Sequence, residues 1–120
     1  MKFPTIQFKA TNTELDENLQ TLLEQKLQSL EKYITDETDL VCEVEFEKVT
    51  YHQSGKVHRL EVNFFKNGDM FRAEAIEDSY EKAIDEVRDE LDKELRRNRN
   101  KRETLFRKGA RKIKEMMRRG

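Results

Sequence analysis

The amino-acid sequence predicts a single α+β domain of order β-α-β-β-β-α, a four-stranded sheet with two helices on one face, followed by a basic helical extension. Two stretches carry apolar residues at helical spacing, and four stretches alternate polar and apolar residues as half-buried strands do. The chain also divides by charge: of its 24 basic and 25 acidic residues, residues 96–120 hold twelve basic and two acidic ones. A body of about −11 therefore precedes a tail of about +10, a division that folding alone does not require.

The first strand and the first helix follow from residues 5–34. Residues 5–9 alternate polar and apolar side chains, which predicts a half-buried strand. Thr13 is the expected N-cap of the helix, with Asp16 three residues later in the manner of a capping box. The helix is expected over about residues 14–34. The stripe that it would bury comprises Leu15, Leu19, Leu22, Leu23, Leu27, Leu30, Tyr33 and Ile34.

Three further strands are expected after a polar connection at residues 36–39. Residues 42–47 and 58–65 each show a two-residue period, and residues 51–56 between them predict a hairpin loop. Asn67-Gly68 then predicts a tight hairpin turn, because both residues tolerate positive φ. Met70 to Ile76 forms the last expected strand, so the three pair as an antiparallel unit.

The second helix is expected to begin at Asp78, as N-cap, with Glu81 at the third helical position. Pro and Gly are nearly absent from residues 78–108, so this helix should continue past its apolar stripe, with a break expected near Asn98 or Asn100. The domain is placed at residues 1–102 and the extension at 103–120. The helix stripe comprises Tyr80, Ala83, Ile84, Val87, Leu91 and Leu95. A weaker stripe in the extension, expected to dock on the body or on a protein partner, comprises Leu105, Phe106, Ala110, Ile113, Met116 and Met117.

The sequence gives little support for catalysis, for a bound cofactor or for a metal site. His52 and His58 have no ligand or nucleophile at a recognised spacing, and there is no glycine-rich phosphate loop. The glutamates at 43, 45 and 47 could be imagined as metal ligands, but cross-strand pairing with Arg59 and Arg72 explains them better. Cys42 alone cannot form a disulfide within the chain, and no apolar run is long enough to span a membrane, so a cytoplasmic protein is expected.

The basic tail favours a polyanionic partner. Helix-dipole preferences and i,i+4 pairs such as Asp89–Lys93 and Asp92–Arg96 account for only a few of the twelve cations. Binding of the extension to a membrane surface is an alternative that the modest apolar stripe supports less well. The expected outer sheet face carries Glu43, Glu45, Glu47, Glu61 and Glu74, which would repel a phosphate backbone. RNA should therefore meet the helical side and the tail.

Residues 1–102 resemble the family of ribosome hibernation promoting factors and ribosome-associated inhibitors. The likeness rests on the order and spacing of several pieces together, since none is diagnostic alone. The pieces are Asn12-Thr13-Glu14-Leu15, Lys26-Leu27 through Leu30-Glu31-Lys32-Tyr33, Phe46-Glu47-Lys48-Val49-Thr50, Glu77-Asp78-Ser79-Tyr80, Ala83-Ile84-Asp85 and the basic end of the second helix.

The resemblance implies a translation inhibitor without catalytic activity that binds the small ribosomal subunit at the mRNA channel, across the tRNA sites, in starved or stationary cells. It implies contacts with ribosomal RNA from both helices, at Lys26, Lys32, Lys93, Arg96, Arg97, Arg99, Lys101 and Arg102. The charge of the tail adds Arg107, Lys108, Arg111 and Lys112. A monomer is expected away from the ribosome, since the chain lacks the dimerisation domain of long relatives. The alternative function is an adaptor between proteins, or a modulator of a transcription complex.

Overall fold

The computed structural model describes residues 4–34, 40–50 and 55–119, with the helical backbone alone at residue 106 and at residues 110–119. The expected connection at 36–39 and most of the expected loop at 51–56 lie outside these ranges. The order β-α-β-β-β-α is confirmed, with a short 3₁₀ helix, η1, directly after the first helix. The elements are β1 (Ile6–Thr11), α1 (Glu17–Gln28), η1 (Ser29–Tyr33), β2 (Leu40–Lys48), β3 (His58–Lys66), β4 (Asp69–Glu77) and α2 (Tyr80–Arg119).

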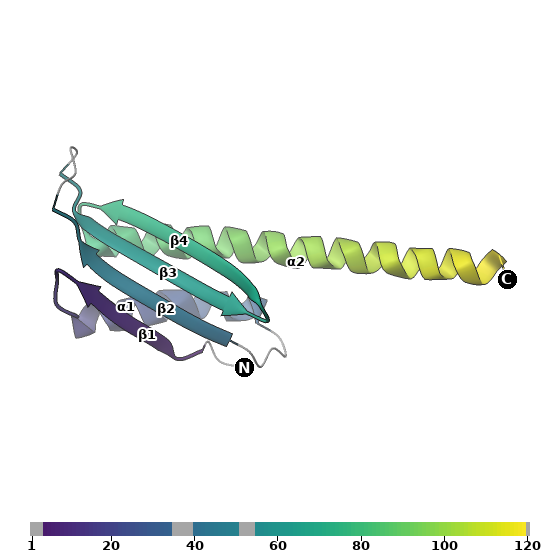
Figure 1. The fold of residues 1–120 in the computed structure, drawn as a ribbon, viewed down its shortest axis with the longest axis horizontal. Helices are drawn as coiled ribbons and strands as arrows, with labels where there is room; N and C mark the ends of the chain where they lie inside the picture. Colours follow the sequence, from purple (N-terminus) through teal and green to yellow (C-terminus); the bar gives the residue numbers. More distant parts are fainter. Residues whose placement is uncertain (1–3, 35–39, 51–54, 120) are drawn as a thin grey trace.

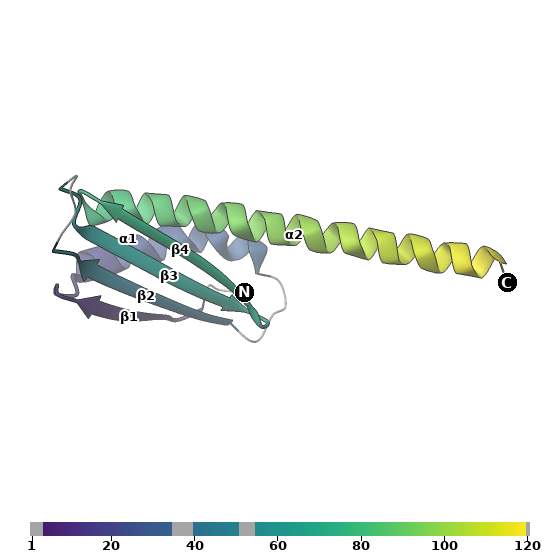
Figure 2. The same cartoon turned by 45° about the horizontal axis from the view of Figure 1, so that its top comes forward.

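The four strands form one mixed sheet in the order β1-β2-β3-β4, and both helices cover the same face of it (Figures 1 and 2). β1 runs parallel to β2, because α1 returns the chain between them, whereas the other neighbours are antiparallel. The β3–β4 turn has Asn67 at φ 50° and Gly68 at φ 87°, which confirms the tight turn expected there. No described helix covers the outer face of the sheet (Figures 1 and 2).

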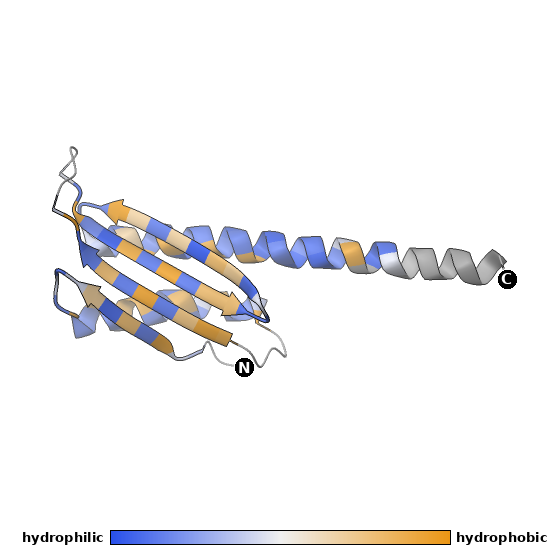
Figure 3. Ribbon diagram, viewed as in Figure 1, coloured by the Kyte–Doolittle hydropathy of each residue, from blue (hydrophilic) through white to orange (hydrophobic). Residues whose placement is uncertain are grey.

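The core lies between the inner sheet face and the two helices. Figure 3 shows the alternation of apolar and polar residues along the central strands, which the sequence period predicted. Phe64, Leu27 and Leu91 are fully buried where β3, α1 and α2 meet, and every residue of the stripe predicted for the second helix is buried. Cys42 lies in the same core, where burial, with a smaller contribution from Glu43, raises the pKa of its thiol to about 12.

The first helix begins later than predicted. Asp16, not Thr13, is the N-cap: its carboxylate oxygen accepts hydrogen bonds from the backbone amides of Asn18 (2.8 Å) and Leu19 (3.2 Å). Leu15 therefore precedes the helix and is 43% exposed instead of joining the buried stripe. The last predicted turn is the 3₁₀ helix η1, which brings Leu30 and Tyr33 onto the core.

The second helix begins at Tyr80, with Ser79 as its N-cap, and is unbroken. The backbone amide of Lys82 donates to the Ser79 hydroxyl (3.3 Å), so the expectation of Asp78 as N-cap is wrong; Asp78 instead forms an ion pair with Lys82 at 3.1 Å. No break occurs at Asn98 or Asn100, because neither residue is strongly enough disfavoured in a helix to interrupt it. α2 runs for 40 residues, roughly 60 Å at 1.5 Å per residue.

Beyond the sheet, α2 projects as an isolated helix (Figure 1). We call residues 96–119 the arm and residues 6–95 the body. The projection gives the molecule its long dimension of 67 Å, against 31 and 19 Å across. Leu105 is 58% exposed, so at this residue the stripe of the extension does not dock on the body, and docking on a protein partner stays a prediction.

Candidate nucleic-acid interface

Two predicted cations, Lys32 of η1 and Arg96 of α2, lie together around the carboxylate of Asp92. The Tyr33 hydroxyl donates to Asp92 at 2.8 Å, and burial together with this bond raises the pKa of Tyr33. Lys32 and Arg96 both lie within ion-pair distance of Asp92, at 3.6 and 3.9 Å. The buried Tyr33 hydroxyl thus holds the Asp92 carboxylate in place. That carboxylate in turn positions two predicted RNA-binding cations, Lys32 and Arg96, beside each other.

Of the neighbouring predicted cations Lys26, Lys93 and Arg97, two are also paired. Lys26 of α1 meets Asp85 of α2 at 3.2 Å, a contact that joins the two helices. Arg97 lies 3.6 Å from Glu94 on its own helix. Lys93 is exposed and has no ion pair with another residue that the structure describes; the expected Asp89–Lys93 pair is replaced by Asp89–Arg88 at 2.8 Å.

Arg99 and Arg102 face the body, although both were predicted to face RNA. They lie four and seven residues after the buried Leu95, so helical spacing puts them on its side of α2. The Arg99 guanidinium lies over the Tyr33 ring at 5.0 Å, and Arg102 pairs with Asp69 of β4 at 2.7 Å. These contacts orient the arm relative to the sheet.

The remaining described cations of the arm are free for a partner. Lys101, Arg107 and Lys108 are exposed, and none forms an ion pair with another described residue. Arg107 is eleven residues from Arg96, and Lys108 is eleven from Arg97, which is about three helical turns, so these cations follow one side of α2. Arg111 and Lys112 continue the same helical backbone.

The outer sheet face is acidic, and its charges are paired across strands. Arg59, 14% exposed, pairs with Glu45 (3.5 Å), Glu47 (3.0 Å), Glu61 and Glu74 (3.1 Å). The predicted pairing of β2 glutamates with Arg59 is confirmed at Glu45 and Glu47, whereas Arg72 contacts Glu61 and Glu74 instead. Burial alone would raise the pKa of Glu61, but hydrogen bonds from Asn63 and Arg59 outweigh it and hold that pKa below its usual range.

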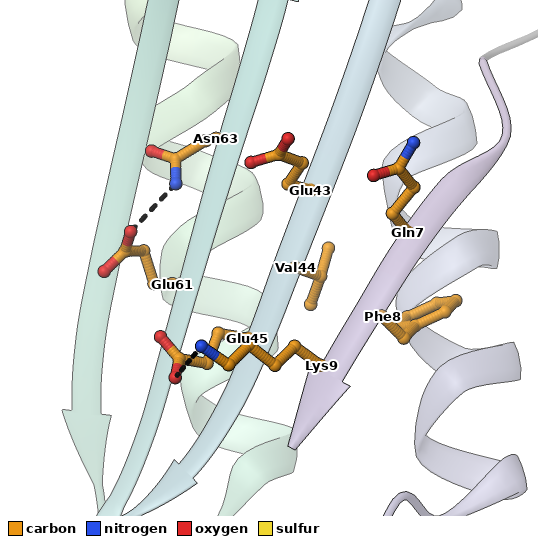
Figure 4. Close-up of a pocket in the computed structure, with 8 residues that line it drawn as sticks. All are labelled: Gln7, Phe8, Lys9, Glu43, Val44, Glu45, Glu61 and Asn63. Carbon is orange, nitrogen blue, oxygen red and sulfur yellow. Dashed lines mark hydrogen bonds and ion pairs between the residues drawn. The ribbon is translucent and has the colours of Figure 1, made fainter. Parts of the chain in front are cut away.

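A shallow hollow between β1 and β3 marks this face (Figure 4). Lys9 reaches across to Glu45 at 4.0 Å, and the Asn63 amide donates to Glu61 at 2.8 Å. Among the residues that the structure describes, no group of three or more His, Cys, Asp and Glu side chains could hold a metal ion. The face thus consists of ion pairs and hydrogen bonds, and its glutamates would repel a phosphate chain.

His58 packs its ring edge-on against Tyr80 at 4.7 Å between centroids, so it lies on the core side of β3. His52 lies outside the described residues. No described helix is both long and apolar enough to cross a membrane.

Three residues at the interface were not assigned a positioning role from the sequence: Tyr33, Asp69 and the buried Lys66. Lys66, 4% exposed, donates to the backbone carbonyl of Tyr33 at 3.2 Å and so joins β3 to η1. Its inward position could have been read from the two-residue period of β3, which continues through Phe64 to Lys66. The Asp69–Arg102 contact is 33 residues apart in sequence and gives no local signal.

The fold and the interface define a class: a small α+β domain with an acidic sheet face and a cationic helical side. The chain belongs to the family described as Sigma 54 modulation protein / S30EA ribosomal protein, which matches residues 6–103. Most of the arm lies beyond this match.

Two solved structures are similar. The Thermus thermophilus Protein Y N-terminal domain has 25% identity and a TM-score of 0.63, over 81% of this chain and 98% of that one. A ribosomal subunit interface protein from Coxiella burnetii shares the fold at 19% identity and a TM-score of 0.63, over 79% of this chain and 97% of that one. A comparison with curated proteins gave no match.

Proposed function

We propose that the chain is a ribosome hibernation factor without catalytic activity. It binds the small ribosomal subunit at the mRNA channel, across the tRNA sites, and inhibits translation in starved or stationary cells. Membership of a family described by a ribosomal protein supports this proposal, as does the likeness to a ribosomal subunit interface protein. Association with ribosomes would place the protein in the cytoplasm, and neither a cofactor nor a small-molecule substrate is part of the proposal.

The observation that carries the proposal is the row of exposed cations on α2 without acidic partners. Each phosphate neutralised by such a cation releases counterions, so RNA affinity would fall steeply with salt. The body would supply shape and a steric block in the channel. Lys32 and Arg96 beside Asp92, together with Arg97, Lys101, Arg107 and Lys108, would contact ribosomal RNA.

Truncation after Leu95 tests this division of roles. Every residue of the described core precedes Arg96, so the shortened chain should still fold, and circular dichroism checks that it does. It should lose most of its sedimentation with purified small subunits and most of the salt dependence of binding. Equal sedimentation of the two chains would refute the role of the arm, and an intact chain that leaves peptide synthesis unaffected would refute inhibition.

The second candidate function is modulation of a transcription complex. It is favoured by the words 'Sigma 54 modulation protein' in the family description. In that case the acidic body and basic arm would join protein partners. Treatment of the co-purified complex with ribonuclease separates the two candidates, because a ribosomal complex would be lost and a protein complex would persist.

A further inference from the structure

The groove between β4 and the first half of α2 is acidic. Glu74 of β4 and Glu86, Asp89 and Glu90 of α2 line it, with two cations, Arg72 and Lys93. Glu90 forms no ion pair with another described residue. The Glu86 carboxyl lies against Glu77, which together with burial raises the pKa of Glu86. The groove is therefore a place where additional positive charge would be stabilised.

The same side of α2 becomes cationic along the arm. Asp89 lies seven residues before Arg96, and Glu90 lies seven before Arg97, so each pair is two turns apart on one side of the helix. That side continues to the exposed Arg107 and Lys108. One continuous surface of α2 thus carries Glu86, Asp89 and Glu90 with the single cation Lys93 over its first half, and cations over its second.

We propose that a second copy of this chain docks along this surface with its α2 antiparallel. Two antiparallel copies place the acidic half of each helix beside the cationic arm of the other, in both directions at once. This is the self-complementary arrangement that a twofold interface requires. With the twofold axis near Asn98, Asp89 and Glu90 of one copy face Lys108 and Arg107 of the other.

Charge complementarity selects a second copy as the occupant. A separate partner would have to match an acidic and a cationic segment in the right order, whereas an antiparallel copy does so by symmetry. The arm is long enough, because it extends well past the end of the sheet (Figure 2). This inference replaces the expectation of a monomer away from the ribosome. It does not depend on the proposed function, although RNA and the second copy would compete for the same cations.

Sedimentation equilibrium of the intact chain across ionic strength is the first test. A dimer is expected at about 0.01 M salt, where charges interact over about 30 Å, and a monomer at about 1 M, where the range is about 3 Å. An intact chain that stays monomeric at low ionic strength overturns the inference.

Two charge-reversed variants locate the interface. Asp89→Lys with Glu90→Lys, and separately Arg107→Glu with Lys108→Glu, should each weaken self-association at least about tenfold, since every pair occurs twice. An equimolar mixture of the two variants should restore a dimer containing one copy of each. Because this restoration needs both chains folded, it also shows that the single variants lost association and not structure. A mixture that stays monomeric overturns the proposal.

A matched control carries the same change of charge elsewhere. Glu14→Lys with Glu43→Lys alters two exposed acids of the body away from the groove, and it should leave the dimer intact. Loss of the dimer in this control would mean that net charge, not the α2 surface, drives association. Sedimentation of the Asp89→Lys, Glu90→Lys variant with small subunits separates the two proposals, since this variant keeps every predicted RNA-binding cation.

Discussion

The body and the arm use charge in opposite ways. In the body, most described cations form ion pairs within the domain. Arg59, for example, pairs with four glutamates. In the arm, acids are scarce, and exposed cations such as Arg107 and Lys108 find no described partner. The body also buries an apolar stripe of α2, whereas Leu105 of the arm is exposed. The body is therefore built to fold, and the arm keeps the charge of Lys101, Arg107 and Lys108 available for another molecule.

The largest expected difference between the two regions is in stability. Phe64→Ala should lower the free energy of unfolding by about 3–5 kcal/mol, because Phe64 is fully buried at the centre of the sheet. Leu105→Ala should change it by less than about 0.5 kcal/mol, because that side chain is largely exposed. Urea unfolding measures both. A cost above about 1 kcal/mol for Leu105→Ala would show that the arm packs on the body.

Arg59→Met should cost about 2–3 kcal/mol at pH 7, because four glutamates would lose a shared, mostly buried cation. The loss should shrink in acid. The pKa of Glu61 is lowered in the folded protein, so its stabilising effect is complete above its unfolded pKa of about 4.3 and is lost as pH falls through the folded value. Unfolding of both proteins at pH 7 and near pH 3 measures this. An equal loss at both values would assign the effect to packing.

Arg107→Ala and Arg102→Ala compare a free cation with a paired one. Arg107→Ala should reduce the slope of log affinity for RNA against log salt by about one, the effect of one phosphate contact. Arg102→Ala should reduce it by less, because Arg102 already contacts Asp69 at 2.7 Å. Filter binding to a short RNA duplex over a salt series measures both slopes. Equal reductions would mean that RNA displaces Asp69.

Gly109→Ala is the mildest change. A Cβ at this position would meet nothing within 4 Å, so the substitution should favour the helical state of the arm by up to about 1 kcal/mol. Amide hydrogen exchange around residue 109 should slow, while the urea midpoint of the body stays unchanged. A shift of that midpoint would show that the arm around residue 109 is coupled to the stability of the body.

Periodicity predicted the fold well because each element buries one face. The stripe from Tyr80 to Leu95 and the alternation of β2, β3 and β4 match the observed core. The ends of the helices were predicted less well, since several polar residues compete there for the same capping position. Asp16 and Ser79 cap the two helices in place of Thr13 and Asp78.

The interface was only half predictable for a related reason. The count of charged residues predicted the cationic arm. It could not predict which of those cations contact the body and which remain exposed for a partner. Arg99 and Arg102 continue the buried side of α2, and only a helix without a break at Asn98 keeps them there. Contacts such as Tyr33–Asp92 join residues 59 apart, and no local pattern encodes them.

All residues of the described core precede Arg96, and this has a consequence for limited proteolysis. A protease can cut a helix only where the backbone opens locally, and an exposed helical segment opens more easily than a packed core. A protease that cuts after Lys or Arg should therefore cleave first around the exposed Arg107 and Lys108 and leave the folded domain intact.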